Sequence, residues 1–410
     1  MPRLPDAQKQ PRRSLLPALR ASLSGPGRHS GDAGRGGHSP CHRRRRPPLK
    51  TAPSAPVRKI LLIGLRSLGD VILTTGAISA LRELYPGARI DYLTRAPYDS
   101  LLEEEPGIHR AFCLPSRKKS LFSNLWVYGR FLLEIRRQGY DLVIDFFARG
   151  PRSRIITLFS GATFRLGLVD KSAWIHRRLD RHVYTMTVCP PVQLALTRDR
   201  IPYLISRLGR IGGVHLPRLT VNETDLDRAR DLLAEEGILE GRYWIFFCGS
   251  GTRTKNWPPD RFYEIAGRLL GEGFHVLCLG GMADREQQEA FAASFGTLPP
   301  GVHLRTQLPW GTLKGLCRLA RGTLSNDSGP AHLAQAVGSP CLVLFGPGDH
   351  VSYAPFFGSF LKADLACQPC QTFAARCPDN QCMKLISSEA VWEEIRRLPA
   401  PSALASFSGE

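Results

Sequence analysis

The chain has 410 residues, a length that exceeds one ordinary domain and predicts two domains of about 150 to 200 residues each. Its formal net charge of +19 would favour a polyanion-binding protein, but residues 1–58 hold 13 Lys and Arg against 2 Asp and Glu. Because more than half of the excess lies in that segment, a polyanion-binding function and a specific nucleic-acid partner are disfavoured for the rest.

Residues 1–56 form a predicted disordered basic tail. The segment is rich in Arg, Pro, Gly and Ser and lacks any amphipathic period, so it cannot bury enough apolar surface to fold alone. Three interpretations remain open: a flexible tail that contacts anionic lipid or another polyanion, an organelle transit peptide, or a translation start farther downstream.

No apolar run approaches the roughly 20 residues that span a bilayer, and no signal peptide is recognisable. We therefore expect a cytoplasmic protein, with peripheral attachment to the cytoplasmic face of the inner membrane as a further possibility. The odd count of 11 cysteines argues against a disulfide framework.

Alternating strand and helix patterns run through the remaining chain. The first series comprises a strand at 59–65, a helix at 71–84, a strand at 89–94, a helix at 122–137 and strands at 141–146 and 163–168. After a break near 210–222, the second series comprises a helix at 225–236, a strand at 243–248, a helix at 260–271, a strand at 275–279, helices at 284–295 and 313–320, a short helix after the turn at 326–330 and a strand at 341–345.

This order predicts an α/β fold with two Rossmann-like, doubly wound domains facing a central cleft. We place the first domain at 57–215 and the second at 216–365, followed by a cysteine-containing segment and helix at 366–410. Ligands of such sheets bind beyond the carboxyl ends of the strands. The polar motifs at 69–70, 249–255, 280–281 and 326–332 all follow predicted strands, which indicates one shared site.

Asp70 follows Gly69 at the start of the predicted helix at 71–84. One interpretation is an N-cap, in which the carboxylate accepts backbone N–H bonds. The other is a carboxylate at the edge of the cleft that acts as a base toward a substrate hydroxyl.

The loop at 249–255 combines glycines, hydroxyls and cations directly after a strand, a composition typical of an anion site. Its candidate ligand-binding residues are Ser250, Thr252, Thr254 and Lys255, and the alternative is a solvated basic loop. Farther along, Gly280 and Gly281 precede Asp284 and Glu286, one of which could accept hydrogen bonds from a nucleotide ribose. An ordinary turn before a helix is equally consistent with that pattern.

The turn at 326–332 opens a helix at Pro330, and free N–H groups at a helix start bind anions. Asp327 could accept from sugar hydroxyls, while Ser328, Gly329 and His332 lie where a phosphate would bind. A second cluster, Cys367, Cys370, Cys377 and Cys382, has the number of thiols of a zinc site but irregular spacing, so structural zinc, an iron–sulfur site and packed thiols all remain open.

Together the segment at 59–84, the loop at 249–255 with Trp257 and Pro258, the segment at 326–333 and the cysteine tail resemble glycosyltransferase family 9, the heptosyltransferases of the lipopolysaccharide inner core. The resemblance covers about residues 57–398. One departure is Arg66, which stands where many relatives have a small hydroxyl residue.

The resemblance implies a GT-B fold and transfer of heptose from ADP-L-glycero-D-manno-heptose with inversion, without a metal or another cofactor. It implies that Asp70 is the general base and that Lys255 holds the leaving diphosphate, helped by Thr252. It further implies that Asp327 contacts the sugar, that Ser328, Gly329 and His332 lie near the phosphates, and that Glu286 rather than Asp284 contacts the ribose.

The expected partners are the nucleotide-sugar donor and a lipid-linked glycan acceptor at the inner membrane face. The alternatives are a family 9 enzyme with another nucleotide sugar or a non-lipopolysaccharide acceptor, and a nucleotide-sugar-binding protein without turnover. The oligomeric state is not predicted.

Overall fold

The computed structural model describes residues 53, 55–116, 120–148, 150–169, 176–191, 193–370, 377 and 379–401. The predicted basic tail at 1–56 therefore lies outside the described residues except at 53, 55 and 56.

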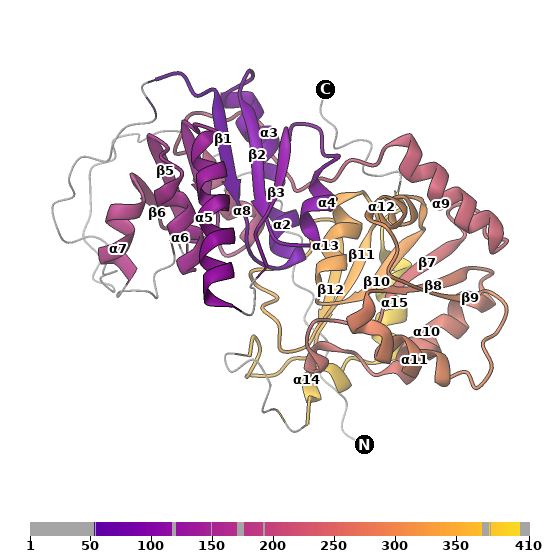
Figure 1. Cartoon of the computed structure of the whole chain (residues 1–410). Helices are drawn as coiled ribbons and strands as arrows, with labels where there is room; N and C mark the ends of the chain where they lie inside the picture. The colour runs from indigo at the N-terminus through magenta and orange to yellow at the C-terminus, as the bar shows by residue number, and fades with distance from the viewer. Residues whose placement is uncertain are drawn as a thin grey trace.

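The first domain is a parallel six-stranded sheet in the order β3-β2-β1-β4-β5-β6, with helices on both faces (Figure 1). Its elements are β1 (Lys59–Ile63), α2 (Leu68–Thr74), α3 (Gly76–Leu84), β2 (Arg89–Thr94), α4 (Tyr98–Leu102), β3 (Arg110–Cys113), α5 (Leu121–Arg137), β4 (Leu142–Asp145), α6 (Pro151–Phe159), β5 (Phe164–Leu168), α7 (His176–Val183), β6 (Met186–Val188) and α8 (Thr197–Ile205).

The second domain repeats this topology, with the strand order β12-β11-β10-β7-β8-β9. Its elements are α9 (Glu223–Glu235), β7 (Tyr243–Phe247), α10 (Pro259–Gly271), β8 (His275–Gly280), α11 (Arg285–Ala293), β9 (Val302–Thr306), α12 (Trp310–Leu319), β10 (Gly322–Asn326), α13 (Gly329–Ala336), β11 (Cys341–Phe345), β12 (Gly358–Lys362), α14 (Gln381–Lys384) and α15 (Ser388–Arg397). The predicted α/β fold with two Rossmann-like domains is confirmed.

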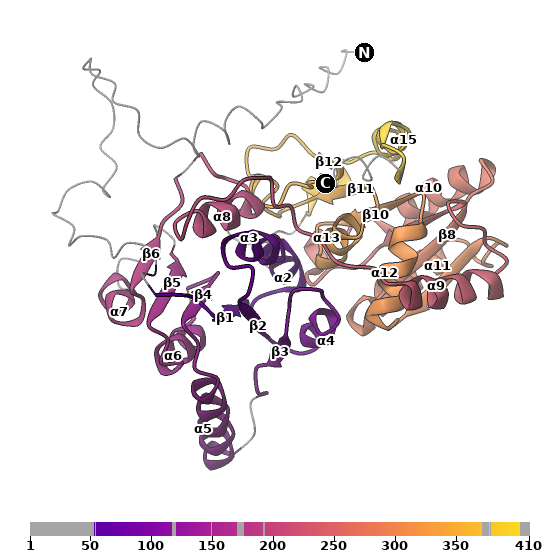
Figure 2. The ribbon, with the colours of Figure 1, turned by 90° about the horizontal axis from the view of Figure 1, so that it is seen from above.

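Each sheet is buried on both faces, which explains why strands such as β7 and β11 are continuous apolar runs. In the first domain α3 and α8 cover one face, while α5 and α6 cover the other (Figure 2). The C-terminal helix α15 packs against α10, and its residues Val391 and Ile395 belong to the core of the second domain.

The helix predicted at 71–84 is two helices, α2 and α3, that meet at Thr75. The hydroxyl of Thr74 donates to the Val71 carbonyl and that of Thr75 donates to the Ile72 carbonyl, each at 2.7 Å. Such hydroxyl bonds compete with the helical backbone bonds and bend or end a helix. Moreover, α2 begins at Leu68, so Asp70 lies within its first turn and the N-cap is Ser67.

A strand was predicted before the turn at 326–332, but the sequence did not give its bounds. This strand is β10, in the middle of the second sheet between β7 and β11. Its sequence is largely polar, yet every residue is buried. The Thr323 and Ser339 hydroxyls pair at 2.9 Å, and Ser325 donates to the Asn326 carbonyl at 2.8 Å. These local bonds let hydroxyls occupy a buried strand, which removes the apolar pattern that would have set its bounds.

The two domains meet along α2 and α13, where an apolar cluster crosses the boundary. Leu68 and Ile72 of α2 pack with Leu333, Ala334 and Val337 on the α13 side. Among the described helices, none is long and apolar enough to span a bilayer.

Trp257 joins the C-terminal segment to the core of the second domain. Its ring is 1% exposed, packs edge-on against Phe262 at 5.0 Å between centroids, and donates from Nε1 to the Ile386 carbonyl at 2.9 Å. Arg261 donates to the same carbonyl. The indole therefore contributes mainly through packing.

We predict that Trp257→Ala lowers the free energy of unfolding by about 3–5 kcal/mol, because it leaves a large cavity. Trp257→Phe should cost less, about 1–3 kcal/mol, since Arg261 still satisfies the carbonyl. Urea unfolding measures both, with Leu239→Ala, at a side chain 72% exposed, as the control. Equal losses for the alanine and phenylalanine variants would contradict this account.

Candidate active site

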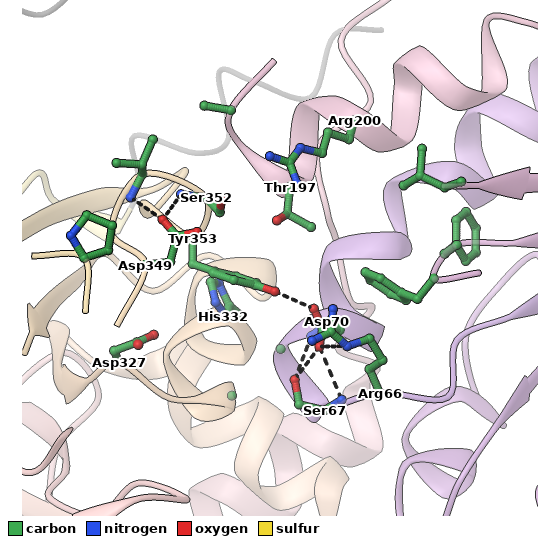
Figure 3. A pocket seen from close by; sticks show the side chains of 18 of the residues that line it. Arg66, Ser67, Asp70, Thr197, Arg200, Asp327, His332, Asp349, Ser352 and Tyr353 are labelled. Atoms are coloured by element: carbon green, nitrogen blue, oxygen red, sulfur yellow. Dashed lines mark hydrogen bonds and ion pairs between the residues drawn. The ribbon is translucent and has the colours of Figure 1, made fainter. Parts of the chain in front are cut away.

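A cleft of about 900 Å³ lies between the two domains (Figure 3). Its lining includes residues just after four strands, β1, β4, β7 and β10. In each sheet two of these strands are neighbours from which the chain winds in opposite directions, the place where doubly wound sheets bind ligands. The predicted residues Gly69, Asp70, Thr252, Lys255, Asp327, Ser328, Gly329 and His332 all line this cleft.

Asp70 is 3% exposed and its two carboxylate oxygens have different partners. Oδ2 accepts from the Ser67 hydroxyl at 2.7 Å and lies 3.5 Å from Arg66 Nε. Oδ1 accepts from the Tyr353 hydroxyl of the second domain at 3.0 Å. Asp70 therefore closes the capping box of α2 from the third helical position with one oxygen and faces the other domain with the other. The N-cap interpretation is wrong, because Ser67 occupies that position, and the role as a base stays a prediction.

Lys255 and Asp327 form an ion pair in the part of the cleft that the second domain lines, with 2.6 Å between Nζ and Oδ2. Both side chains are largely buried, at 18% and 10% exposure. The carboxylate holds the ammonium beside the start of α13. An ammonium has three donors, so Lys255 can bind a ligand anion while it keeps this bond.

The start of α13 borders the same space. Ser328 is its N-cap in extended conformation, and no backbone N–H of the first turn is bonded to the Ser328 hydroxyl. His332 lies in this turn, its Nδ1 is buried without a hydrogen-bond partner among the described atoms, and burial lowers the pKa of its imidazole. A neutral ring is therefore expected at pH 7. A buried polar atom without a partner costs roughly 1–3 kcal/mol, which a bound ligand could recover.

Two glycines allow α2 and α13 to approach each other at this edge of the cleft. A Cβ on Gly69 would lie 2.7 Å from Cδ2 of His332, and a Cβ on Gly329 would lie 2.7 Å from Cβ of Leu68. Real Cβ atoms do not approach so closely. The domain contact beside Asp70 and His332 therefore depends on glycine on both sides.

Three predicted binding residues do not line the cleft. The Ser250 hydroxyl donates to the Thr252 carbonyl at 2.8 Å and also bonds Asn256, so it shapes the loop. The Thr254 hydroxyl is buried without a described partner. Glu286 forms an exposed ion pair with Arg253 at 2.6 Å. Asp284, the alternative candidate for the ribose contact, accepts from the Gly281 N–H at 2.9 Å. Their roles toward a ligand stay predictions.

Several residues that line the cleft carry no role that their sequence pattern predicts. Tyr353 follows β11 in an irregular segment without a motif, and it reaches Asp70 only through the domain arrangement. Burial, followed by the nearby Asp70 charge, raises the pKa of Tyr353 to about 12, so its hydroxyl remains a donor at neutral pH. Arg66 was noted only as a departure from relatives, yet its guanidinium lies beside Asp70 and over the Phe147 ring at 5.1 Å.

None of the four clustered cysteines lines the cleft, although Pro369, between Cys367 and Cys370, does. Cys367 and Cys377 are exposed, Cys370 is half-buried and Cys382 is buried. Burial raises the pKa of Cys382, and the charges of Cys377 and Cys367 add smaller contributions. Within the described part of the chain, no group of three metal-ligating side chains is assembled. The structural zinc therefore stays a prediction.

A family model described as glycosyltransferase family 9 (heptosyltransferase) matches residues 128–380. Lipopolysaccharide heptosyltransferase 1 of Pseudomonas aeruginosa is 29% identical over 331 residues, which cover 76% of this chain and 86% of that protein.

Two solved structures share the arrangement of both domains. A glycosyl transferase family 9 protein from Veillonella parvula superposes with a TM-score of 0.69 at 21% identity, covering 83% of this chain and 96% of that one. An Escherichia coli heptosyltransferase with ADP-2-deoxy-2-fluoro heptose gives 0.63 at 18% identity, covering 83% and 99%. These likenesses bear on the fold alone, and they confirm the predicted GT-B architecture.

The close approach of α2 and α13 can be tested with Gly329→Ala. We predict a loss of about 1–3 kcal/mol in the free energy of unfolding, because the new methyl group overlaps Leu68 and forces the domains to shift. The matched control is Gly267→Ala within α10, where a Cβ meets no atom within 4 Å. There we expect unchanged stability or a gain of up to about 1 kcal/mol. A loss of the same size in both variants would refute the assigned contact.

Proposed function

This chain belongs to glycosyltransferase family 9, and from that premise we propose that it transfers heptose from ADP-L-glycero-D-manno-heptose to the inner core of lipopolysaccharide. Its similarity to lipopolysaccharide heptosyltransferase 1 and to a heptosyltransferase with ADP-2-deoxy-2-fluoro heptose supports the acceptor and the sugar. One observation carries the catalytic part: Asp70 of the first domain and the Lys255–Asp327 pair of the second line a single cleft.

Asp70 acts in this proposal as the general base. The acceptor hydroxyl approaches Oδ1, which accepts from Tyr353 and has lone-pair capacity for one more donor. As the hydroxyl oxygen bonds to the anomeric carbon, the bond from that carbon to the diphosphate breaks and the proton passes to Asp70. A single displacement of this kind inverts the anomeric configuration. Ser67 and Arg66 fix the carboxylate so that Oδ1 faces the second domain.

Lys255 and the start of α13 stabilise the departing diphosphate. The cation, the N–H groups of the first helical turn and the helix dipole are fixed in place before the reaction, so they stabilise negative charge as it develops. These groups supply the charge without a metal ion, and the donor is the sole small molecule that the proposal requires. Thr252, Ser328, Gly329 and neutral His332 add hydrogen bonds, and Asp327 holds Lys255 while it contacts the sugar.

The donor nucleotide extends from this point toward β8, where Glu286, or alternatively Asp284, contacts the ribose. Ser250 supports the loop that bears Lys255, and Thr254 of the same loop is a further predicted contact of the donor. The acceptor is a lipid-linked glycan presented at the cytoplasmic face of the inner membrane. Two alternatives remain to be separated by experiment: a family member with another nucleotide sugar or acceptor, and a nucleotide-sugar-binding protein without turnover.

The donor assignment is tested by calorimetric titration with a panel of nucleotide sugars. We expect ADP-heptose to bind more tightly than UDP- and GDP-sugars. A preference for a uridine or guanosine donor would overturn the assignment, while tight binding of ADP-heptose without transfer to an inner-core acceptor would favour the binding protein.

The two halves of the cleft should respond differently to substitution. We predict that Asp70→Asn lowers kcat by about 10²- to 10⁴-fold with ADP affinity unchanged, because it removes the base and leaves the donor site intact. Lys255→Gln should weaken ADP binding by about ten- to a hundredfold, the contribution of a charge-assisted bond. Lys384→Gln, at an exposed lysine of α14, is the matched charge control and should alter neither constant. Full transfer by Asp70→Asn would remove this carboxylate from the mechanism.

A further inference from the structure

Helix α5 has two apolar faces, of which the fold uses one. Phe131 and Ile135 are buried against the first sheet. The other face bears Phe122, Leu125, Trp126 and Leu133, which are 83%, 72%, 62% and 53% exposed. These positions have the spacing i, i+3, i+4 and i+11, so they form one stripe along the helix. Folding of the described chain leaves this stripe in solvent.

Helix α6 repeats the pattern beside α5. Ile155, Leu158 and Phe159 are 46%, 45% and 51% exposed and share one face by the same spacing. The Arg152 guanidinium of α6 lies over the Tyr128 ring of α5 at 6.0 Å, which places the two helices against each other. Figure 2 shows α5 projecting from the first domain on the side of the sheet opposite α3 and α8. The seven exposed apolar residues of both helices are called here the α5–α6 surface.

Exposed cations flank this surface. Arg130, Arg136, Arg137 and Arg152 are exposed, and the Arg130 guanidinium lies over the Trp126 ring at 4.7 Å. The sole acidic residue within either helix, Glu134, is already paired with Arg110 at 2.7 Å. Apolar side chains bordered by arginines therefore form a net positive patch.

We propose that the α5–α6 surface binds the anionic face of a lipid bilayer. Exposed aromatic and aliphatic side chains enter the interfacial layer, while arginines at the margin reach the phosphates of the headgroups. A second copy of the chain fits less well. A twofold interface would place these arginines against their own counterparts with one acid, already paired, to offset them.

The position of the surface connects it to the cleft. Phe146 and Phe147 follow β4 and line the cleft, and α6 begins at Pro151 a few residues later. Bilayer binding itself does not depend on the proposed function. The consequence for catalysis does rest on it: a lipid-linked acceptor would be presented to the first domain beside Asp70.

Vesicle flotation of the full chain tests the binding. We expect it to float with vesicles of phosphatidylcholine and phosphatidylglycerol in equal amounts, to float less with phosphatidylcholine alone, and to bind more weakly at high salt. The double variant Phe122→Ser, Trp126→Ser should lower the partition coefficient by at least about tenfold, because it removes two large apolar groups. Leu239→Ser, at a side chain 72% exposed in the second domain, should leave it unchanged.

Three outcomes would overturn the proposal. The first is that the wild-type chain does not bind anionic vesicles, and the second is that the double variant binds them as well as wild type does. The third is that sedimentation shows a wild-type dimer that the double variant does not form, which would assign the surface to a second copy. Circular dichroism establishes that the double variant is folded.

A transfer assay separates this inference from the proposed function. With an acceptor embedded in vesicles, the double variant should raise KM, whereas with a water-soluble acceptor fragment it should match wild type. Absence of transfer by the wild-type chain to both acceptors would refute the proposed function and leave the flotation result standing.

Discussion

The contact between α2 and α13 is the constraint on which the rest of the site depends. Each helix starts just after the central strand of its own sheet, β1 or β10, so each brings its N-terminus to the carboxyl edge of that sheet. The helices can meet closely because Gly69 and Gly329 lack side chains at the crossing. Apolar residues behind them, including Leu68 and Leu333, stabilise the contact and fix the distance across the cleft.

This arrangement divides the electrostatics of the cleft between the domains. The first domain contributes a fixed carboxylate, Asp70, held by Ser67 and Arg66. The second contributes a cation, Lys255, held by Asp327 beside a helix N-terminus. In the proposed reaction the base and the leaving-group stabiliser act at opposite ends of the reacting bonds, and two domains can hold them apart without mutual neutralisation. Tyr353 crosses the gap and couples the position of Asp70 to the second domain.

The sequence predicted the elements whose patterns are strong. Strands β2 and β11 were predicted with their observed bounds, and α5 and β7 to within one residue. Two departures from the predictions lie where side-chain hydrogen bonds replaced the expected pattern: at Thr75, where one helix became two, and in the polar buried strand β10, whose bounds the sequence did not give. The sequence did not predict a role for Arg66, Tyr353 or the exposed stripe of α5. The contacts of Arg66 and Tyr353 depend on which residues the fold brings beside them, and the exposure of the stripe depends on which elements pack against α5.

The sequence by itself determined the twofold α/β repeat and the loops that carry the candidate chemistry, because strand-loop-helix order and residue type are local properties of the chain. Only the tertiary structure decided that Asp70 faces Tyr353, that Lys255 pairs with Asp327, and that Glu286 turns to Arg253 instead of lining the cleft. These pairings join residues as many as 283 positions apart. Which residues pair depends on how the two domains pack across α2 and α13, and a local sequence pattern carries no information about that packing.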